Sequence, residues 1–349
     1  MTIDKLVALK IFAKRFLFEI GGLRLWHRFV NRRNLTVVMF HRVVPLNDSR
    51  FSSANPHYTI TPDEFRSCLS FFKKFYSVVS LEQVKAACGG ATLPPCPLLI
   101  TFDDGWRDTL DYAAPVLREF DLPAVVFVST GQLGTNEGYW QEDILRLADR
   151  GDLKIDEAIA ICGGEDAFSQ KSRGQKWPDA MVEKLNRIPP SMRRTAIKGL
   201  SARRACLDRT MLNEAELVQL SGLNFDIGGH GHSHDPLTEI GDIEVEIKNC
   251  RERLSNLPLK AAPESFSFPH GRYNRQISDT AEHHGFRMRF SSEPLLNSVD
   301  TLDGAEAIGR IEIDLSRLRT GNGFDSRRNL PELAMNLVLR PARRGPANE

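Results

Sequence analysis

The sequence predicts an α/β protein built as a (β/α) barrel, seven-stranded and irregular, with an N-terminal amphipathic helix and a helical insertion. Two observations carry this prediction. Short apolar runs alternate with amphipathic helical stretches through most of the 349 residues, and alternating strands and helices form a parallel sheet. Carboxylates and histidines follow two of the apolar runs, and barrel enzymes keep their chemistry on the loops after the strands.

Residues 1–34 carry eight Lys or Arg against Asp4 and Glu19, interleaved with apolar side chains. Such a basic amphipathic helix either lies on an anionic membrane surface or docks on the domain that follows it. The charges within the apolar stretch and the absence of a small-residue cleavage site argue against a signal peptide or a spanning helix. We therefore expect a cytoplasmic protein, free or peripheral on the inner face of the membrane.

The barrel domain is expected over residues 35–320, because its apolar runs are short, rich in β-branched residues and bounded by turn residues, as buried parallel strands are. The predicted strands are LTVVMF (35–40), YSVVS (76–80), LLITF (98–102), AVVFVS (124–129), FDIGG (225–229), ESFSFP (264–269), FRMRF (286–290) and IGRIEI (308–313).

Helices are predicted between these strands. Thr61 followed by Pro62 is a typical helix start for residues 61–75, and residues 108–120 likewise begin at a carboxylate. Two further helices are expected, IEVEIKNCRERLSNL (243–257) and a short one near ISDTAEHHG (277–285).

The strand and helix alternation is interrupted at about 137–215, where charged helical patterns occur without a clear strand, and this stretch is interpreted as an insertion. Residues 321–349 are predicted to be a C-terminal tail. A formal net charge of +1 gives no support to nucleic-acid binding through bulk charge. The six cysteines are scattered without a CxxC pair, which excludes a zinc-thiolate site and favours a reducing compartment.

The run LLITF ends on Asp103, Asp104 and Gly105. Two adjacent carboxylates at the end of a buried strand repel each other, and burial adds to the cost of charging either one. One interpretation is a turn in which a carboxylate caps the next helix. The other is a site where a cation is bound.

A second loop, after FDIGG, holds His230, His232 and His234 within five residues. Imidazole and carboxylate are the usual ligands of catalytic zinc, and three protein ligands leave one coordination position open. HxxxH alone is common by chance, and a lone histidine is usually polar surface. The conjunction of both loops at strand ends of one barrel favours a metal site.

These motifs carry a resemblance. TFDDG, the HxxxH of IGGHGHSHDPL and the downstream FPHGRYN resemble successive motifs of the polysaccharide deacetylase family, also called the NodB homology domain or carbohydrate esterase family 4. The resemblance extends from about Val37 to Ile313, and VMFHRV and TPDEFRSCLSFFKKFYSVVSLEQV are similar to an N-terminal extension found in that family.

The resemblance implies a role for each motif residue. Asp103 would be the general base, and Asp104, His230 and His234 would bind one divalent metal ion, with zinc expected and cobalt, nickel or iron as alternatives. The metal charge would offset the repulsion between the two carboxylates and lower the pKa of a water molecule toward about 7. The main chain at His270 would donate a hydrogen bond to the oxyanion.

The sequence departs from the family pattern at three places. Ser267 stands where the family often has an Arg that orients the base, His270 replaces a Tyr, and no histidine follows His284 to supply the general acid. We expect His270, or second His41 at the end of the first strand, to protonate the leaving amine. Arg310 is a candidate to replace the missing arginine, although strand arginines more often form structural ion pairs.

The sequence thus predicts a metal-dependent hydrolase that removes an acetyl group from an N-acetylated amino sugar in polysaccharide or glycoconjugate biosynthesis. The expected substrate is a nucleotide-linked or lipid-linked precursor, with no nucleic-acid partner. Two alternatives stay open: a catalytically inactive carbohydrate-binding or scaffold protein, and an O-ester deacetylase or deformylase, which would use the same residues.

Overall fold

The fold is described here from a computed structural model, for residues 16, 19–136, 138–164, 177–204 and 206–316. Its centre is a curled, mostly parallel sheet that forms a (β/α) barrel, as the sequence predicted. The strands follow one another in the order of the chain: β1 (Asn34–Phe40), β5 (Pro97–Phe102), β6 (Ala124–Val128), β7 (Phe225–Gly229), β8 (Ser265–Ser267) and β9 (Met288–Phe290).

Short strands complete the sheet at its two edges. β10 (Asn297–Ser298) and β11 (Ile311–Glu312) both pair with β1, and β4 (Ser77–Val78) pairs with β5. Ile308 also forms a bridge with Phe290 of β9. The segment 308–312 therefore joins the last strand to the first. A separate pair, β2 (Arg42–Val43) and β3 (Thr59–Ile60), lies beside the barrel end.

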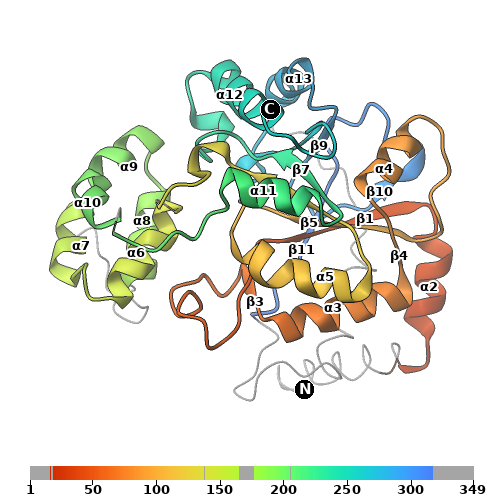
Figure 1. Cartoon of the computed structure of the whole chain (residues 1–349), viewed down its shortest axis with the longest axis horizontal. Coiled ribbons are helices and arrows are strands. Elements are labelled where there is room, and N and C mark those ends of the chain that lie inside the picture. The colour runs from red at the N-terminus through yellow and green to blue at the C-terminus, as the bar shows by residue number, and fades with distance from the viewer. Residues whose placement is uncertain (1–15, 17–18, 137, 165–176, 205, 317–349) are drawn as a thin grey trace, which may run out of the picture.

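Helices cover the outside of the sheet (Figure 1). α3 (Pro62–Phe75) begins as predicted, because the Thr61 hydroxyl accepts from the Glu64 amide in a capping box. The other covering helices are α4 (Leu81–Cys88), α5 (Ala114–Phe120), α11 (Glu214–Ser221), α12 (Ile243–Ser255) and α13 (Arg275–His283). The strands read as continuous apolar runs because both faces of the sheet are buried, for example at Val37 and Val38 of β1.

One helix start differs from the prediction. Residues Thr109–Ala113 form a π-helical turn before α5, and the Asp108 side chain does not cap it. Instead the Asp108 carboxylate accepts hydrogen bonds from the Arg42 guanidinium and the Val43 amide, both buried. The Asp108 side chain therefore pairs with a buried arginine instead of capping the start of the helix.

In the described residues between β6 and β7, the region of the predicted insertion contains helices and no strand. They are α6 (Trp140–Asp149), α7 (Ile155–Ile161), α8 (Trp177–Asn186), α9 (Pro190–Ile197) and α10 (Ser201–Arg204). Figure 1 shows them as a group on one side of the barrel. They share an apolar core of their own, which includes Leu147, Met181 and Leu185.

Only part of the predicted N-terminal helix is described, as α2 (Gly22–Val30). Its His27 is buried and lies 3.2 Å from the carbonyl oxygen of Phe75, so this helix docks on the domain. Residues 1–15 and 17–18 and the predicted tail, 321–349, lie outside the described residues. Among the helices that are described, every one is too short or too polar to cross a lipid bilayer.

Candidate metal centre and active site

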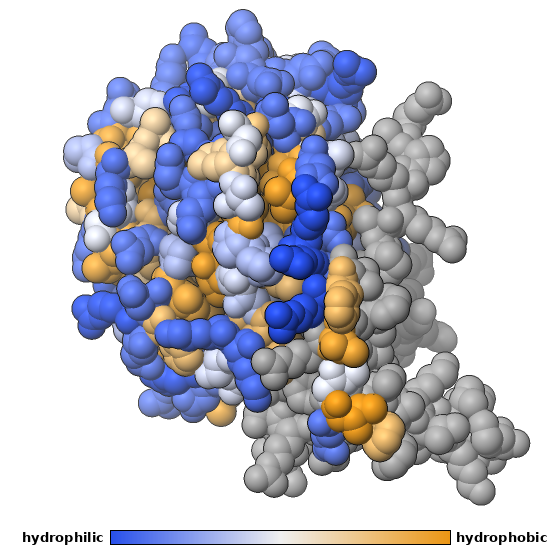
Figure 2. Space-filling view, turned by 90° about the vertical axis from the view of Figure 1, so that its right-hand side faces the viewer, coloured by the Kyte–Doolittle hydropathy of each residue, from blue (hydrophilic) through white to orange (hydrophobic). Residues whose placement is uncertain are grey.

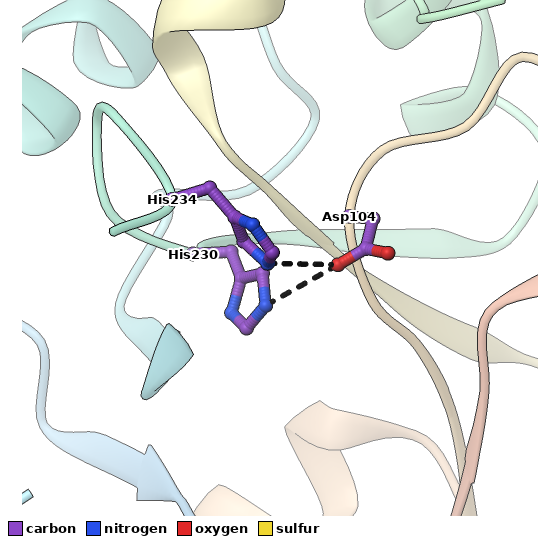
Figure 3. A group of neighbouring side chains, drawn as sticks. All are labelled: Asp104, His230 and His234. Carbon is purple, nitrogen blue, oxygen red and sulfur yellow. Dashed lines mark ion pairs between the residues drawn. The ribbon is translucent and has the colours of Figure 1, made fainter. Parts of the chain in front are cut away.

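The two motif loops meet at the carboxyl end of the barrel (Figure 3). Asp103 and Asp104 follow β5 directly, and His230 follows β7, where its amide still pairs with Val128 of β6. Carboxyl ends of parallel strands gather at one edge of the sheet, so residues more than a hundred positions apart become neighbours. Asp104 Oδ1 lies 3.5 Å from His230 Nε2 and 3.3 Å from His234 Nε2.

These spacings fit one metal ion. Donor atoms of Asp104, His230 and His234 all lie within 4.8 Å of one another. Tetrahedral zinc with ligand bonds of about 2.0–2.1 Å needs neighbouring donors roughly 3.3–3.4 Å apart. Asp104 Oδ1 meets that requirement with each histidine. The group is the one constellation of this kind found in the described part of the chain.

Neighbouring groups orient the histidines. His230 Nδ1 lies 2.8 Å from the Ser267 carbonyl oxygen, which can only accept, so Nδ1 carries the proton and Nε2 presents a lone pair toward Asp104. The loop before His234 is held by Glu246 of α12, whose Oε1 accepts from the amides of His232 and Ser233. His232 itself turns toward Thr130, with 2.9 Å between its Nδ1 and the hydroxyl oxygen.

Asp104 is held by aromatic residues on its other side. Trp106 donates its indole N–H to Asp104 Oδ2 at 2.9 Å. Tyr139 donates its hydroxyl to the Asp104 carbonyl oxygen at 2.7 Å, and its ring packs at a tilt against that of His234 with 4.2 Å between centroids. The Arg42 guanidinium lies 4.2 Å from the centre of the Trp106 ring and also pairs with Glu142 of α6. The insertion thereby contacts the metal ligands through buried side chains.

Asp103 is paired with Arg310. The guanidinium donates to both carboxylate oxygens, at 2.6 Å and 2.7 Å, and a third donation reaches the Ser267 hydroxyl at 2.8 Å. Ser267 in turn donates to Asp103 Oδ2 at 3.2 Å. Arg310 is fully buried on the segment that joins β9 to β1. A buried arginine from the final strand thus holds both carboxylate oxygens of Asp103.

The charges of the site shift its pKa values. Burial opposes ionisation of Asp103, but the Arg310 guanidinium and His230 outweigh it and lower the pKa of this carboxyl. Burial likewise opposes ionisation of Asp104, and the two histidines hold its pKa well below the usual range. Burial lowers the pKa of His230, yet Asp103 and Asp104 together raise it. Both carboxylates are therefore ionised at neutral pH.

His270 and His41 both line the cavity that contains this cluster. The His270 ring is 4.8 Å from the His234 ring, and its Nε2 lies 3.2 Å from the His234 carbonyl oxygen. Burial, with the neighbouring His234 and His230, lowers the pKa of His270 to about 3. The His41 ring packs at a tilt against that of Tyr58, with 4.6 Å between ring centroids, and lines the same cavity as the candidate metal ligands.

Backbone strain also gathers here. Six non-glycine residues in the described ranges have positive φ, and three of them, Asp104 (79°), His234 (67°) and His270 (57°), belong to this site. Such conformations persist where the surrounding contacts enforce them, and they cluster at functional sites. Gly105 follows with φ 79°, where an added Cβ would also lie 2.9 Å from Val128 Cγ1. That close approach explains the glycine of the DDG turn.

Sequence reasoning had singled out Asp103, Asp104, His230, His234, His270, His41 and Arg310, and the fold brings all of them to one end of the barrel. It missed Trp106, Tyr139 and Arg42. A tryptophan two positions after a metal-ligand candidate was an available signal. Arg42 follows His41 directly and is only 2% exposed.

Comparisons with known proteins agree with the fold. The sequence model described as polysaccharide deacetylase matches residues 91–157 and 204–289. No curated protein sequence matches at a significant level. Among solved structures, the Streptococcus pyogenes deacetylase PplD in complex with acetate superposes with a TM-score of 0.54 and 17% identity, over 88% of this chain and 99% of that one.

Two further solved structures are similar in fold. IcaB from Ammonifex degensii has a TM-score of 0.52 and 18% identity, covering 86% of this chain and 97% of its own. A de-N-acetylase from Aggregatibacter actinomycetemcomitans has a TM-score of 0.51 and 18% identity, covering 80% of this chain and 95% of its own. Residues 158–203, which include α8 and α9, lie outside the matched segments of the family.

Proposed function

We propose that this chain, which belongs to the polysaccharide deacetylase family, is a metal-dependent hydrolase that removes an acetyl group from an N-acetylated amino sugar in polysaccharide or glycoconjugate biosynthesis. The observation that carries the proposal is the pairing of two different carboxylates. Asp104 faces two histidines that share its Oδ1, and Asp103 beside it is fixed by Arg310. A binding protein would need the first arrangement alone.

Asp104, His230 and His234 are the residues that would hold the metal, and an Asp/His/His donor set suits zinc, with cobalt, nickel or iron as alternatives. A divalent cation bound there would lower the pKa of a water molecule and polarise the acetyl carbonyl. No thiolate takes part, since the six cysteines of the chain lie elsewhere.

Asp103 is the proposed general base. Its carboxylate is ionised because Arg310 lowers its pKa, and its position is fixed by three hydrogen bonds from Arg310 and Ser267. A carboxylate oxygen 3.9 Å from His230 Nε2 borders the metal site without belonging to the ligand set. It can therefore accept the proton of the attacking water.

His41 is the proposed general acid, ahead of His270. An acid must carry a proton at the working pH, and His270, with a pKa of about 3, does not. A bound cation would lower that pKa further. The ring of His270 also directs Nε2 at a carbonyl oxygen. This reverses the order that the sequence favoured.

Metal analysis combined with acetate release from a panel of N- and O-acetylated sugars tests the proposal. We expect one divalent ion per chain and release from an N-acetylated sugar. His234→Ala should lose both metal and activity, whereas Asp103→Asn should lose activity alone. A parent protein that binds metal and acetylated sugars but releases no acetate would establish the inactive carbohydrate-binding alternative. Faster release from O-acetylated sugars would favour the ester hydrolase.

Membrane contact through α2 is a further part of the proposal. Leu25 and Phe29 are 61% and 75% exposed on the face of α2 away from the barrel, and Arg28, Arg32 and Lys74 line a recess beside them. Figure 2 shows a mainly hydrophilic surface on this side of the molecule, with apolar groups scattered in it. Sedimentation with anionic vesicles should therefore recover the protein, and Leu25→Glu with Phe29→Glu should abolish recovery.

A further inference from the structure

We propose that the cavity-facing side of α8 forms a subsite for the sugar units next to the acetylated one, and that this subsite takes uncharged glycan rather than a phosphate-linked sugar. The inference rests on the proposed deacetylase function and adds the class of substrate. Because α8 lies outside the segments that match the family, the subsite belongs to this chain's own insertion.

The cavity over the metal centre reaches the insertion. Its volume is about 1260 Å³, and its lining includes both the metal ligands and residues of α8. Ligand pockets for small molecules are commonly about 300–1,000 Å³. The cavity is therefore larger than one sugar unit requires, and the additional wall is helical.

The two faces of α8 have different surroundings. Ala180, Met181 and Leu185 are buried in the core of the insertion. Asp179, Glu183 and Asn186, spaced by four and then three positions, lie on one face of the helix and line the cavity. The same sequence that anchors the helix therefore presents a polar surface to the space above the metal ligands.

This wall offers the groups that bind sugars. Trp177, half-buried at the start of α8, lines the cavity with an aromatic surface, and apolar rings with a few placed polar groups are typical of ligand pockets. Gln141 of α6 also lines the cavity, and its buried Oε1 accepts no hydrogen bond within the described part of the chain. An unsatisfied buried acceptor requires a partner, and a sugar hydroxyl would supply one.

The charges of the cavity disfavour a phosphate ligand at this wall. Three arginines line the cavity, and each already pairs with a carboxylate: Arg42 with Asp108 and Glu142, Arg193 with Asp235, and Arg272 with Glu239. The described lining contains no lysine, while the exposed Asp179 and Glu183 line it, and Glu183 is paired with Arg187. Away from the metal site, a diphosphate would therefore meet the Asp179 carboxylate and side-chain cations that are already paired. This argues against the nucleotide-linked precursor that the sequence analysis expected.

The test compares N-acetylglucosamine oligomers of one, two and four units with UDP-N-acetylglucosamine, using acetate release by the metal-loaded full chain. Trp177→Ala should lower kcat/KM for the tetramer about tenfold and leave the monomer unchanged. Asn186→Ala, an exposed position where folding is not at stake, should lower it about threefold. Met192→Ala, an exposed apolar residue of the same insertion, is the matched control and should change neither. UDP-N-acetylglucosamine should be the poorest substrate.

Equal effects of Trp177→Ala on monomer and tetramer, or none on either, would overturn the subsite. A UDP-sugar hydrolysed better than the tetramer would overturn its charge preference. Should the parent release no acetate from any acetylated sugar, it is the deacetylase function that fails. In that case calorimetry still tests the subsite. The affinity for the tetramer is measured for Asp103→Asn and for Asp103→Asn combined with Trp177→Ala, and identical affinities would contradict the subsite.

Discussion

The barrel end and the helical insertion have buried centres of different kinds. At the barrel end, Asp103, Asp104 and Arg310 are 8% exposed or less, and each is compensated by another charge or by hydrogen bonds. In the insertion, the core consists of apolar side chains such as Leu147 and Met181, and the buried Asp143 of α6 is paired with Arg204 and Arg146. The barrel end therefore depends mainly on charge pairing, whereas the core of the insertion depends mainly on apolar packing.

This difference predicts which substitutions should affect activity and which should affect stability. Removing one partner of a buried ion pair leaves an uncompensated charge, which costs more than the pair itself contributes. Removing a buried methyl group leaves a cavity whose cost stays local when the core is separate. Substitutions at the barrel end should thus affect chemistry and metal, and those in the insertion core should affect stability first.

Asp103→Asn should produce the largest effect, a loss of about 10³ in kcat, because an amide cannot accept the proton of the attacking water. Metal content measured by elemental analysis should stay at the parent level. Equal loss of metal in Asp103→Asn and Asp104→Asn would show that Asp103 is a ligand and that another group is the base.

His41→Gln should lower turnover about 10²-fold and remove the fall in activity toward alkaline pH, since the leaving amine loses its proton donor. His270→Gln is the paired control and should retain most turnover, because its imidazole is neutral at the working pH. Steady-state rates across pH decide between them. If His270→Gln lost more turnover than His41→Gln, His270 would be the general acid, as the sequence analysis first expected.

Arg310→Gln should destabilise the metal-free protein by about 3 kcal/mol at pH 7, because Asp103 is left buried without its partner. The sign of the pH dependence follows from the lowered pKa of Asp103. Its stabilisation is present above the unfolded pKa and is lost as the pH falls through the lower folded value. Urea unfolding of parent and variant should therefore differ most near neutral pH and converge in acid.

Trp106→Phe should weaken metal affinity by roughly tenfold, since partners that orient a ligand typically contribute 10- to 100-fold. The ring stays available to Arg42, and only the N–H to Asp104 Oδ2 is lost. Competition with a chelating dye measures the change. An unaltered affinity would mean that Tyr139 and the backbone suffice to hold Asp104.

Leu147→Ala should have the smallest effect on the metal centre and yet cost about 3 kcal/mol in the insertion core. Metal affinity and monomer turnover are expected to match the parent protein, while hydrogen exchange over residues 140–161 accelerates. Loss of metal in this variant would break the comparison, because it would show that the two regions share one cooperative unit through Glu142 and Arg42.

The strands and the meeting of Asp104, His230 and His234 could be predicted from sequence because each is marked locally. Apolar runs such as residues 98–102 mark strands, and strand ends of one parallel barrel converge wherever they lie in the chain. Thr61 marked its helix by the capping pattern alone. A contact that a single side chain makes with a distant helix or strand has no such local sequence pattern.

Arg42 illustrates that limit. As one arginine beside a histidine it resembles surface charge, and only the fold shows Asp108 and Glu142 converging on it from 66 and 100 positions away. Tyr139 reaches Asp104 over 35 positions in the same way. The cavity-lining face of α8 could not be predicted either, because exposed polar residues on a helix do not indicate which part of the molecule they face.

Because Arg310 comes late in the sequence, the pairing of Asp103 with its arginine forms late in synthesis and folding. Asp103, the proposed base, and Arg310 are 207 residues apart, and a chain emerges and folds from its N-terminus. The proposed metal ligands have all been made once His234 has been made, but Asp103 lacks its arginine until the segment around 308–312 docks between β9 and β1. With the proposed roles, a nascent or truncated chain would hold all three ligands and still lack the arginine that fixes the base.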